Sequence, residues 1–434
     1  MNKKNIMVTS LKKYPLQRRW SIAPVAVLLL LQVFFHPAIA QLRAGAASAG
    51  INPPIGAYVA GHTQNRKFKR VHDDIFVKAV VVTDGSKSIT ILTFDCIGLL
   101  YPQLLEIRSA VAGRIRDKAF DTSAIVMSST HTHTGPDVVG LWGPDLMHSG
   151  VDSAYMKFLV RTASEQVVRA WKSRKRVSAD YSVSRHGEGW VWNISQPDEL
   201  DRSLTVLRFR DRKDRPVAIM TNFACHPTIL DGAHEEVSSD YVAGYYQRMD
   251  SLFGGVNLFL QGAIGGWVQP EHEEKTFERA LYRGRGIADA VQAGLQQSRP
   301  LGGNGVTLHR QIFDMPVDNP AFRQLSVLGV IRRQMSASVA TEVAVFRIGD
   351  AMFATHPGET VPAMSLATKE LMPTQGPKFV MGLGMDAMGY ILKPEFFARR
   401  KEIPHAEYLC GMSAGPKTSA EVMKVIGSLC SMFR

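Results

Sequence analysis

The 434-residue chain has four cysteines, too few for a disulfide-dense scaffold. Lysine and arginine form no long block: the run Arg66-Lys67-Phe68-Lys69-Arg70 is short and typical of a solvated loop, so no nucleic-acid partner is expected. Internal repeats, low-complexity linkers and a second long hydrophobic stretch are also missing. What remains is an ordinary composition, 45% apolar and 21% charged, which indicates one large globular domain or two average ones.

The first 40 residues contain no aspartate or glutamate. Six lysines and arginines precede the apolar segment 25–35, which is short for a membrane span and is followed by the small-x-small sequence Ala38-Ile39-Ala40. This pattern predicts a secretory signal peptide cut after Ala40, with an uncleaved anchor as the alternative. Cleavage would leave a domain at 41–434 without a transmembrane span and lower the formal charge from +12 to +6. We therefore expect a periplasmic or secreted protein.

Export would place the cysteines in an oxidising compartment. Cys410 and Cys430 are the best candidates for a disulfide, because they are near one another and outside the predicted core strands. Cys96 and Cys225 lie in apolar, strand-like runs and are predicted to be buried free thiols.

Helical and strand periodicities alternate along the chain. Strand pairs around polar turns are predicted at 75–82 with 89–95, 204–209 with 216–223, and 343–348 with 351–355, and further strands at 124–128 and 256–260. Helical spacing is present at 104–118, 154–172, 241–252 and 279–296. This mixture predicts an α/β layered domain whose sheet is mixed rather than all parallel.

The most informative motif is Thr130-His131-Thr132-His133-Thr134-Gly135-Pro136, which follows the apolar strand at 124–128. Residues two apart on a strand point to the same face, so we expect both imidazoles to lie side by side at a strand end. Imidazole is both a frequent metal ligand and a general acid or base. An H-x-H pair alone is a weak signal, and two histidines on an exposed strand edge would explain it equally well.

Two later strands end in matching groups. His226 follows an apolar strand and is followed at once by Pro227, and the sequence His356-Pro357-Gly358-Glu359 presents a carboxylate after a third strand. Tyr390 lies in a loop rich in glycine and methionine, where a packing role would be the ordinary explanation. Together these segments predict a metal site at strand ends.

The ordered set of motifs resembles the neutral (alkaline, non-lysosomal) ceramidases and bacterial proteins that share their N-terminal catalytic domain. T-H-T-H-T-G-P is its most specific piece. The other matching segments, between about residue 50 and residue 418, are Gly50-Ile51-Asn52-Pro53-Pro54-Ile55-Gly56, His72-Asp73-Asp74, Asp201-Arg202-Ser203-Leu204-Thr205-Val206-Leu207, F-A-C-H-P-T, Ser239-Asp240-Tyr241, H-P-G-E-T and Gly389-Tyr390-Ile391.

The resemblance implies a zinc amidohydrolase that cleaves an N-acyl amide such as a ceramide-like lipid, which entails transient contact with a membrane surface. It assigns the zinc ligands to four residues: His131, His226, Glu359 and Tyr390. It also implies that His133 contacts the substrate or the transition state, and that Tyr408 contacts the substrate. Two imidazoles and a carboxylate form a common catalytic zinc set that leaves room for water and the scissile carbonyl. Tyr390 would then ligate as phenolate or donate a hydrogen bond to the oxyanion, and His133 would stabilise that oxyanion or protonate the leaving amine.

The chain departs from the family where the family binds its substrate. Gly262 stands where ceramidases carry an active-site serine, Ile194 stands where they carry an arginine, and the family's N-x-Y reads Met385-Asp386-Ala387. The chain also stops soon after Tyr408, so we expect the C-terminal immunoglobulin-like domain of ceramidases to be absent. Metal ligands are thus kept while substrate contacts are altered.

Other motifs favour structural explanations. Gly411-Met412-Ser413-Ala414-Gly415 fits G-x-S-x-G, but no histidine or aspartate follows Ser413, as a nucleophile elbow would require. His234-Glu235-Glu236 and His272-Glu273-Glu274 lack the second histidine of H-E-x-x-H. Asp73, Asp74, Asp95 and Asp240 are expected to cap loops, with orientation of metal ligands as the alternative.

Three functions remain open from the sequence. The first is an exported zinc hydrolase of N-acyl amides. The second is a zinc hydrolase of the same fold that acts on a different, non-sphingolipid amide or ester. The third is a catalytically silent relative that binds a ligand.

Overall fold

The computed structural model describes residues 41–434 together with Met1, Thr9 and Ser10. The predicted signal peptide and its cleavage point therefore lie outside the described residues. Residues 41–434 belong to one compact unit. Within them, no helix has the length and apolar character needed to cross a membrane.

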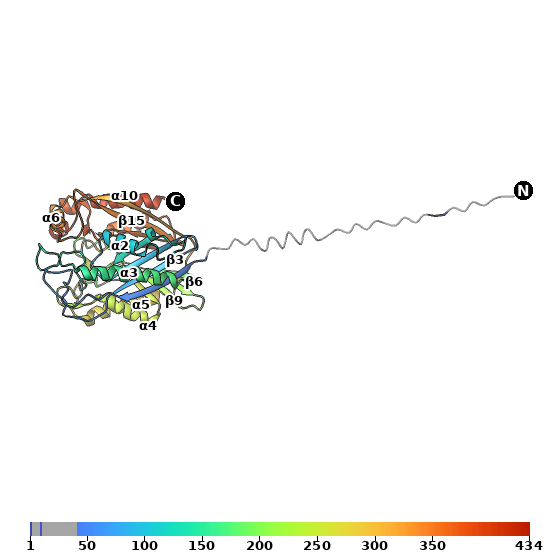
Figure 1. Ribbon diagram of the computed structural model, residues 1–434, viewed down its shortest axis with the longest axis horizontal. Coiled ribbons are helices and arrows are strands. Elements are labelled where there is room, and N and C mark those ends of the chain that lie inside the picture. The colour runs from blue at the N-terminus through green and yellow to red at the C-terminus, as the bar shows by residue number, and fades with distance from the viewer. Residues whose placement is uncertain (2–8, 11–40) are drawn as a thin grey trace. The chain divides into compact units, whose positions relative to one another are not determined.

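The main sheet has nine strands and is mixed (Figure 1). The pairs β9–β11 and β4–β5 are parallel, and the other pairs are antiparallel, so the predicted mixed sheet is confirmed. In spatial order the strands are β11 (Val256–Gln261), β9 (Pro216–Phe223), β8 (Ser203–Asp211), β6 (Lys175–Arg185), β1 (Arg43–Gly50), β3 (Phe76–Thr83), β4 (Ser88–Phe94) and β5 (Ile125–Ser129), with β13 (Arg299–Pro300) paired to β6.

A second sheet of four strands is formed by the C-terminal part of the chain. Its order is β14 (Val306–Pro316), β15 (Ser338–Ile348), β16 (Ala351–Thr355) and β18 (Lys378–Met381), and only β16–β18 is parallel within it. Three short pairs complete the strands: β17 (Glu359–Thr360) with β19 (Tyr390–Ile391), β7 (Val191–Asn193) with β12 (Val268–Pro270), and β2 (Arg70–Val71) with β10 (Glu236–Val237).

Helices cover the sheets with one apolar face each. In α3 (Ser153–Lys172), Leu159, Ala163 and Val167 recur at helical spacing and are fully buried, and the helix packs on β1 and β3. Figure 1 shows α4 (Tyr241–Leu252) and α5 (Phe277–Leu295) on one side of the molecule and α10 (Thr418–Ser431) beside β15 on the other. The remaining helical segments are α2 (Tyr101–Val111), η1 (Thr122–Ala124), α6 (Pro320–Val327), α7 (Pro362–Leu371), α8 (Pro394–Ala398) and α9 (Ala406–Gly411).

The carboxyl ends of three parallel strand pairs, β4–β5, β9–β11 and β16–β18, are joined to one another. Met385 N donates to Met127 O, Gly382 N donates to Gln261 O, and the buried Gln261 amide donates to the carbonyls of Thr130 and Cys225. Because these strand ends lie at one place, the loops that follow the strands are brought together there. Open α/β sheets bind ligands at such carboxyl ends.

The predicted elements are present, with shifted ends. The helix expected at 104–118 is observed at Tyr101–Val111, while α4 has the predicted bounds. The proposed Cys410–Cys430 disulfide is wrong, because all four cysteines, each within the described chain, are free thiols. Sequence proximity was misleading: Cys410 lies in α9 and is partly exposed, whereas Cys430 is buried near the end of α10.

Candidate metal centre

The H-x-H pair lies in a turn and not in a strand. Strand β5 ends at Ser129, and His131 has a left-handed backbone with φ of 69°. The alternation of side chains along a strand, which the sequence had suggested, therefore does not explain why the two rings converge. The turn does: the ring centroids of His131 and His133 lie 5.0 Å apart, and each is near His226, at 5.0 and 5.9 Å. Non-glycine residues in this backbone region are uncommon and often mark functional sites.

All three imidazoles are held through Nδ1. His131 Nδ1 lies 2.5 Å from Ile97 O, His226 Nδ1 lies 2.9 Å from Val268 O, and His133 Nδ1 lies 3.2 Å from Asp231 Oδ1. Carbonyl and carboxylate oxygens only accept, so each Nδ1 must carry the proton. Each neutral ring then presents the lone pair of Nε2 on its other side. Metal-binding histidines are typically oriented in this way.

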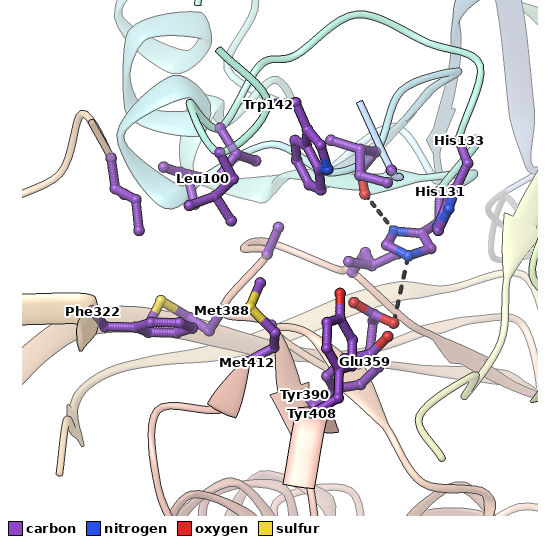
Figure 2. Close-up of a pocket in the computed structure, with 18 of the residues that line it drawn as sticks. Leu100, His131, His133, Trp142, Phe322, Glu359, Met388, Tyr390, Tyr408 and Met412 are labelled. Atoms are coloured by element: carbon purple, nitrogen blue, oxygen red, sulfur yellow. Dashed lines mark hydrogen bonds and ion pairs between the residues drawn. The ribbon is translucent and has the colours of Figure 1, made fainter. Parts of the chain in front are cut away.

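Glu359 lies opposite two of these nitrogens. Its Oε2 is 3.1 Å from His226 Nε2 and 3.4 Å from His131 Nε2. Figure 2 shows the second of these contacts, between His131 and Glu359. The short strand that carries Glu359 pairs in parallel with the strand of Tyr390, and the two residues are direct partners in the register. Trp267 Nε1 donates to Tyr390 Oη at 2.8 Å, which leaves the Tyr390 hydroxyl proton free to donate elsewhere.

The donor set fits a metal cation. Nε2 of a neutral His131 and Oε2 of Glu359 are both acceptors, so their approach is unfavourable unless a positive charge lies with them. His133 Nε2 is buried and finds no hydrogen-bond partner within the described part of the chain. The ligand atoms of His131, His133 and His226 all lie within 4.8 Å of one another. This histidine cluster can hold a metal ion.

Electrostatics in the centre follow from burial and from this pairing. Burial disfavours the charged form of His131, but the Glu359 carboxylate outweighs it and raises the pKa of that imidazole. Burial likewise opposes ionisation of Glu359, yet His131 and His226 hold the pKa of its carboxyl far below the ordinary value. Burial lowers the pKa of His226 and, together with Glu359, raises that of Tyr390 well above its usual range. Without a metal, the negative charge in the centre lies on the Glu359 carboxylate, and the neighbouring imidazoles stabilise it.

The structure thus brings together every residue that was predicted for the site: His131, His133, His226, Glu359, Tyr390 and Tyr408. The ligand atoms that lie close enough together to hold a metal ion belong to His131, His133 and His226. Glu359, which was predicted as a ligand, lies beside this cluster through its contact with His226. Tyr408 is half exposed at the rim, with its ring centroid 6.4 Å from that of Tyr390. Their individual roles as ligands or substrate contacts stay predictions.

Three supporting residues were missed by the sequence reasoning. Asp231 holds His133, Gln261 joins the strand ends, and Trp267 holds Tyr390. Asp231 and Trp267 come from loops without periodicity, and no sequence signal identified them. Gln261 lies next to Gly262, in the segment where the family's serine is missing.

The four other candidate groups act as expected in loops. Asp240 precedes α4 and accepts from Tyr241 N and Leu230 N, and Asp73 accepts from Ser238 Oγ. Asp74 accepts from Asn52, and Asp95 accepts from Phe76 N and Tyr246 Oη. Ser413 of the G-x-S-x-G sequence is buried just after α9, so it is not placed as a nucleophile elbow after a strand.

Packing explains the glycine at the family's serine position. A Cβ on Gly262 would lie 2.7 Å from Ala224 Cβ, 2.9 Å from Ala224 Cα and 3.1 Å from Ala224 N. Real Cβ atoms essentially never come so close to a backbone, so a serine would force this strand end to move. Ile194, at the family's arginine position, donates its backbone N–H to Trp267 O.

Two cavities open from the histidine cluster and share Gly61, His133, Tyr390 and Tyr408. The apolar lobe, of about 80 Å³, is lined mainly by Leu100, Leu141, Trp142, Phe322, Met388 and Met412. Figure 2 shows Leu100, Phe322 and Met388 at the end of this lobe that lies away from the histidines. The polar lobe, of about 370 Å³, is lined by His62, Thr63, Thr228, Asp231, Trp267 and Gln269 besides the shared residues and His226.

The fold and the site define a mixed α/β protein with a candidate metal centre at the carboxyl ends of its strands. Residues 45–249 match the sequence profile described as neutral/alkaline non-lysosomal ceramidase, N-terminal. Over this N-terminal region, the predicted resemblance to the neutral/alkaline ceramidases is confirmed.

Individual relatives are distant. The chain is 23% identical to neutral ceramidase B of Dictyostelium discoideum over 181 residues, and 24% identical to the neutral ceramidase of Drosophila pseudoobscura pseudoobscura over 232 residues. These matches cover 37% and 48% of this chain, but only 24% and 32% of the relatives' own lengths.

Solved structures show the same fold. The neutral ceramidase from Pseudomonas aeruginosa superposes with a TM-score of 0.73 at 15% identity, over 91% of this chain and 74% of that chain. A structure described as ceramidase complexed with C2 matches equally well, with the same score and identity. At 15% sequence identity, this similarity shows a shared fold alone.

Proposed function

We propose that this protein is a zinc-dependent amidohydrolase that cleaves an N-acyl amide into a carboxylic acid and an amine. One observation carries the proposal: three Nε2 lone pairs and the Glu359 carboxylate converge beside two cavities, with each imidazole fixed through its Nδ1. Histidine nitrogens with one carboxylate are a common set for catalytic zinc. The match of residues 45–249 to the ceramidase profile supports the same reaction class.

Zinc held by such residues lowers the pKa of water towards about 7 and polarises a carbonyl oxygen. The side chains around it have complementary tasks. Tyr390, whose Oη accepts from Trp267, can direct its own proton to the oxygen of the scissile carbonyl. Asp231 accepts from His133 Nδ1 and so directs Nε2 of that ring towards the centre.

In the overall reaction the oxygen of water bonds to the acyl carbon, and the carbon–nitrogen bond breaks. The leaving nitrogen takes the proton that the water loses, and His133 is placed to carry it, since the Nε2 lone pair faces the centre and is otherwise unpartnered among the described residues. The contact between His133 Nδ1 and Asp231 fixes the orientation of this ring, which keeps Nε2 aimed at the centre.

The substrate is proposed to be an N-acyl amphiphile, ceramide-like in having an acyl chain on an amide nitrogen. The apolar lobe beside His131 suits such a chain. The relatives are named ceramidases, and this name supports the class of bond. We also propose export to the periplasm or outside the cell and transient contact with a membrane surface. A different amide or ester remains the second candidate, because Gly262 and Ile194 replace two family residues.

The test combines metal analysis with turnover. Purified protein is assayed for zinc by mass spectrometry, and for release of fatty acid from N-acyl amides with and without chelator. We expect about one zinc per chain and chelator-sensitive release. His131→Ala and Glu359→Ala should abolish release, whereas His148→Ala, a matched change at an exposed histidine, should not affect it.

Two results would contradict the proposal. Full activity of His131→Ala or Glu359→Ala would show that the metal assignment is wrong. Stoichiometric zinc without turnover of any amide or ester would favour the third possibility, a protein that binds its ligand without cleaving it.

A further inference from the structure

The two lobes differ in chemistry, and the histidine cluster lies where they meet. The apolar lobe contains His131, His133 and Glu359, and the polar lobe contains His133 and His226. A bond that reaches the cluster therefore has one side in each lobe. The substrate should be apolar on one side of the scissile bond and polar on the other.

The polar lobe is also the larger cavity, at about 370 Å³ against about 80 Å³. A ceramide carries two long apolar chains, one on each side of its amide. Hydrogen-bonding side chains are concentrated in the polar lobe, so the second chain would lie partly against Asp231, Thr228 and Gln269. Burying those polar groups against a hydrocarbon chain without hydrogen bonds would cost affinity.

Both aromatic and hydrogen-bonding groups line the polar lobe. The rings of Trp267 and Tyr408 have centroids 5.6 Å apart, and both line this cavity. The hydroxyls of Thr63 and Thr228 and the carboxylate of Asp231 line it as well. An aromatic surface beside hydrogen-bonding groups suits a saturated ring that has both C–H faces and hydroxyls.

The charge balance of this lobe disfavours a cationic ligand. Asp231 is already paired with His133 Nδ1, and the ammonium of Lys275 donates to the Asp231 carbonyl at 2.9 Å. His62 also lines the cavity. The carboxylate thus has a hydrogen-bond partner in His133 and an ammonium nearby in Lys275, so it does not require a cationic head group.

We propose that the polar lobe binds the amine part of the substrate, and that this part is an uncharged hydroxylated ring, as in an N-acyl amino sugar with one acyl chain. This inference rests on the proposed amide hydrolysis for its orientation. The acyl chain lies in the apolar lobe, and the ring lies between Trp267, Tyr408 and Asp231. A two-chain ceramide is accordingly a poor ligand.

Binding can be measured apart from catalysis. In chelator, where no turnover is expected, calorimetry should give at least tenfold tighter binding of N-dodecanoyl-glucosamine than of N-dodecanoyl-sphingosine. N-dodecanoyl-ethanolamine, which has the same chain and a small head group, should fall between them. Equal or tighter binding of the two-chain ligand would overturn the proposal.

Cavity-filling variants locate each part of the ligand. Thr63 is exposed and lines only the polar lobe of the two, so Thr63→Trp should weaken binding of N-dodecanoyl-glucosamine at least tenfold and leave that of N-dodecanoyl-ethanolamine within about twofold. Met412→Trp, in the apolar lobe, should weaken both dodecanoyl ligands and spare N-acetylglucosamine. Ser431→Trp, exposed and outside both lobes, is the control.

The outcomes separate the two proposals. A Thr63→Trp variant that affects both head groups alike would contradict the ring site even if the zinc-loaded protein hydrolyses amides. Selective binding that survives these tests, together with zinc-loaded protein that cleaves no amide, would support the ring site and refute the proposed hydrolysis.

Discussion

Restoring the family's serine at position 262 is expected to destabilise this protein without activating it. The added Cβ would lie 2.7 Å from Ala224 Cβ, and 2.9 and 3.1 Å from the Ala224 backbone. Both residues follow neighbouring parallel strands, β9 and β11, and Gly262 N donates to Phe223 O, so neither backbone can move alone. Overpacking of this kind costs about 1–3 kcal/mol. For a chain of this size that lowers the unfolding midpoint by roughly 1–4 °C.

The assay is thermal unfolding of Gly262→Ser in chelator, so that metal binding does not contribute to the midpoint. Ala224→Gly removes the closest contact, and the double variant should recover part of the lost stability while the two backbone contacts remain. Additivity of the two changes would be unexpected, because the residues touch. An unchanged midpoint for Gly262→Ser alone would refute the packing argument, and a gain in amide hydrolysis would show that the site tolerates the serine after all.

Three further predictions concern stability. Saturating zinc at about 1,000 times its Kd should stabilise the protein by about 4 kcal/mol, measured by urea unfolding with and without chelator, and His131→Ala should remove this difference. Burial raises the pKa of Asp240 from 3.8 to about 7, so the folded state holds this proton longer than the unfolded state. Stability from this group is therefore present below pH 4 and falls by up to about 1.4 kcal/mol per pH unit between pH 4 and 7; Asp240→Asn should flatten that slope in urea titrations, and an unchanged slope would exclude Asp240 as its source. Arg333 and Asp386 form a buried pair at 2.6 Å beside the apolar lobe, so Arg333→Met should cost about 3–5 kcal/mol, whereas Arg399→Ala, at an exposed pair, should be nearly neutral.

Local patterns predicted the strands and helices well where the chain alternates strongly. The predicted bounds of α4 are those observed, and the hairpin of β3 and β4 forms around the predicted turn. The main-sheet order was beyond sequence reasoning, because β1 lies between β6 and β3 through pairings that no local pattern encodes. Disulfide pairing failed for the same reason: distance along the chain says little about distance in space.

The site could be predicted in part because its residues end apolar strands. His131, His226 and Glu359 each follow such a strand, and parallel strands deliver their carboxyl ends to one place. Tyr390 was identified only through the family resemblance. Asp231 and Trp267 could not be found, because their roles depend on loop conformations that bring them to His133 and Tyr390.

The junction of three parallel strand pairs has a consequence for how the protein reaches its native state. The groups of the candidate metal centre are spread from residue 131 to residue 390, and Gln261 joins two of the strand ends directly. Contacts between residues so far apart in sequence form late and slowly, because closing long loops costs entropy before any contact compensates for it. No early segment carries all of these groups, so a metal bound at this centre would not act as the nucleus of folding. Acquisition of metal should instead report that the whole chain has finished folding.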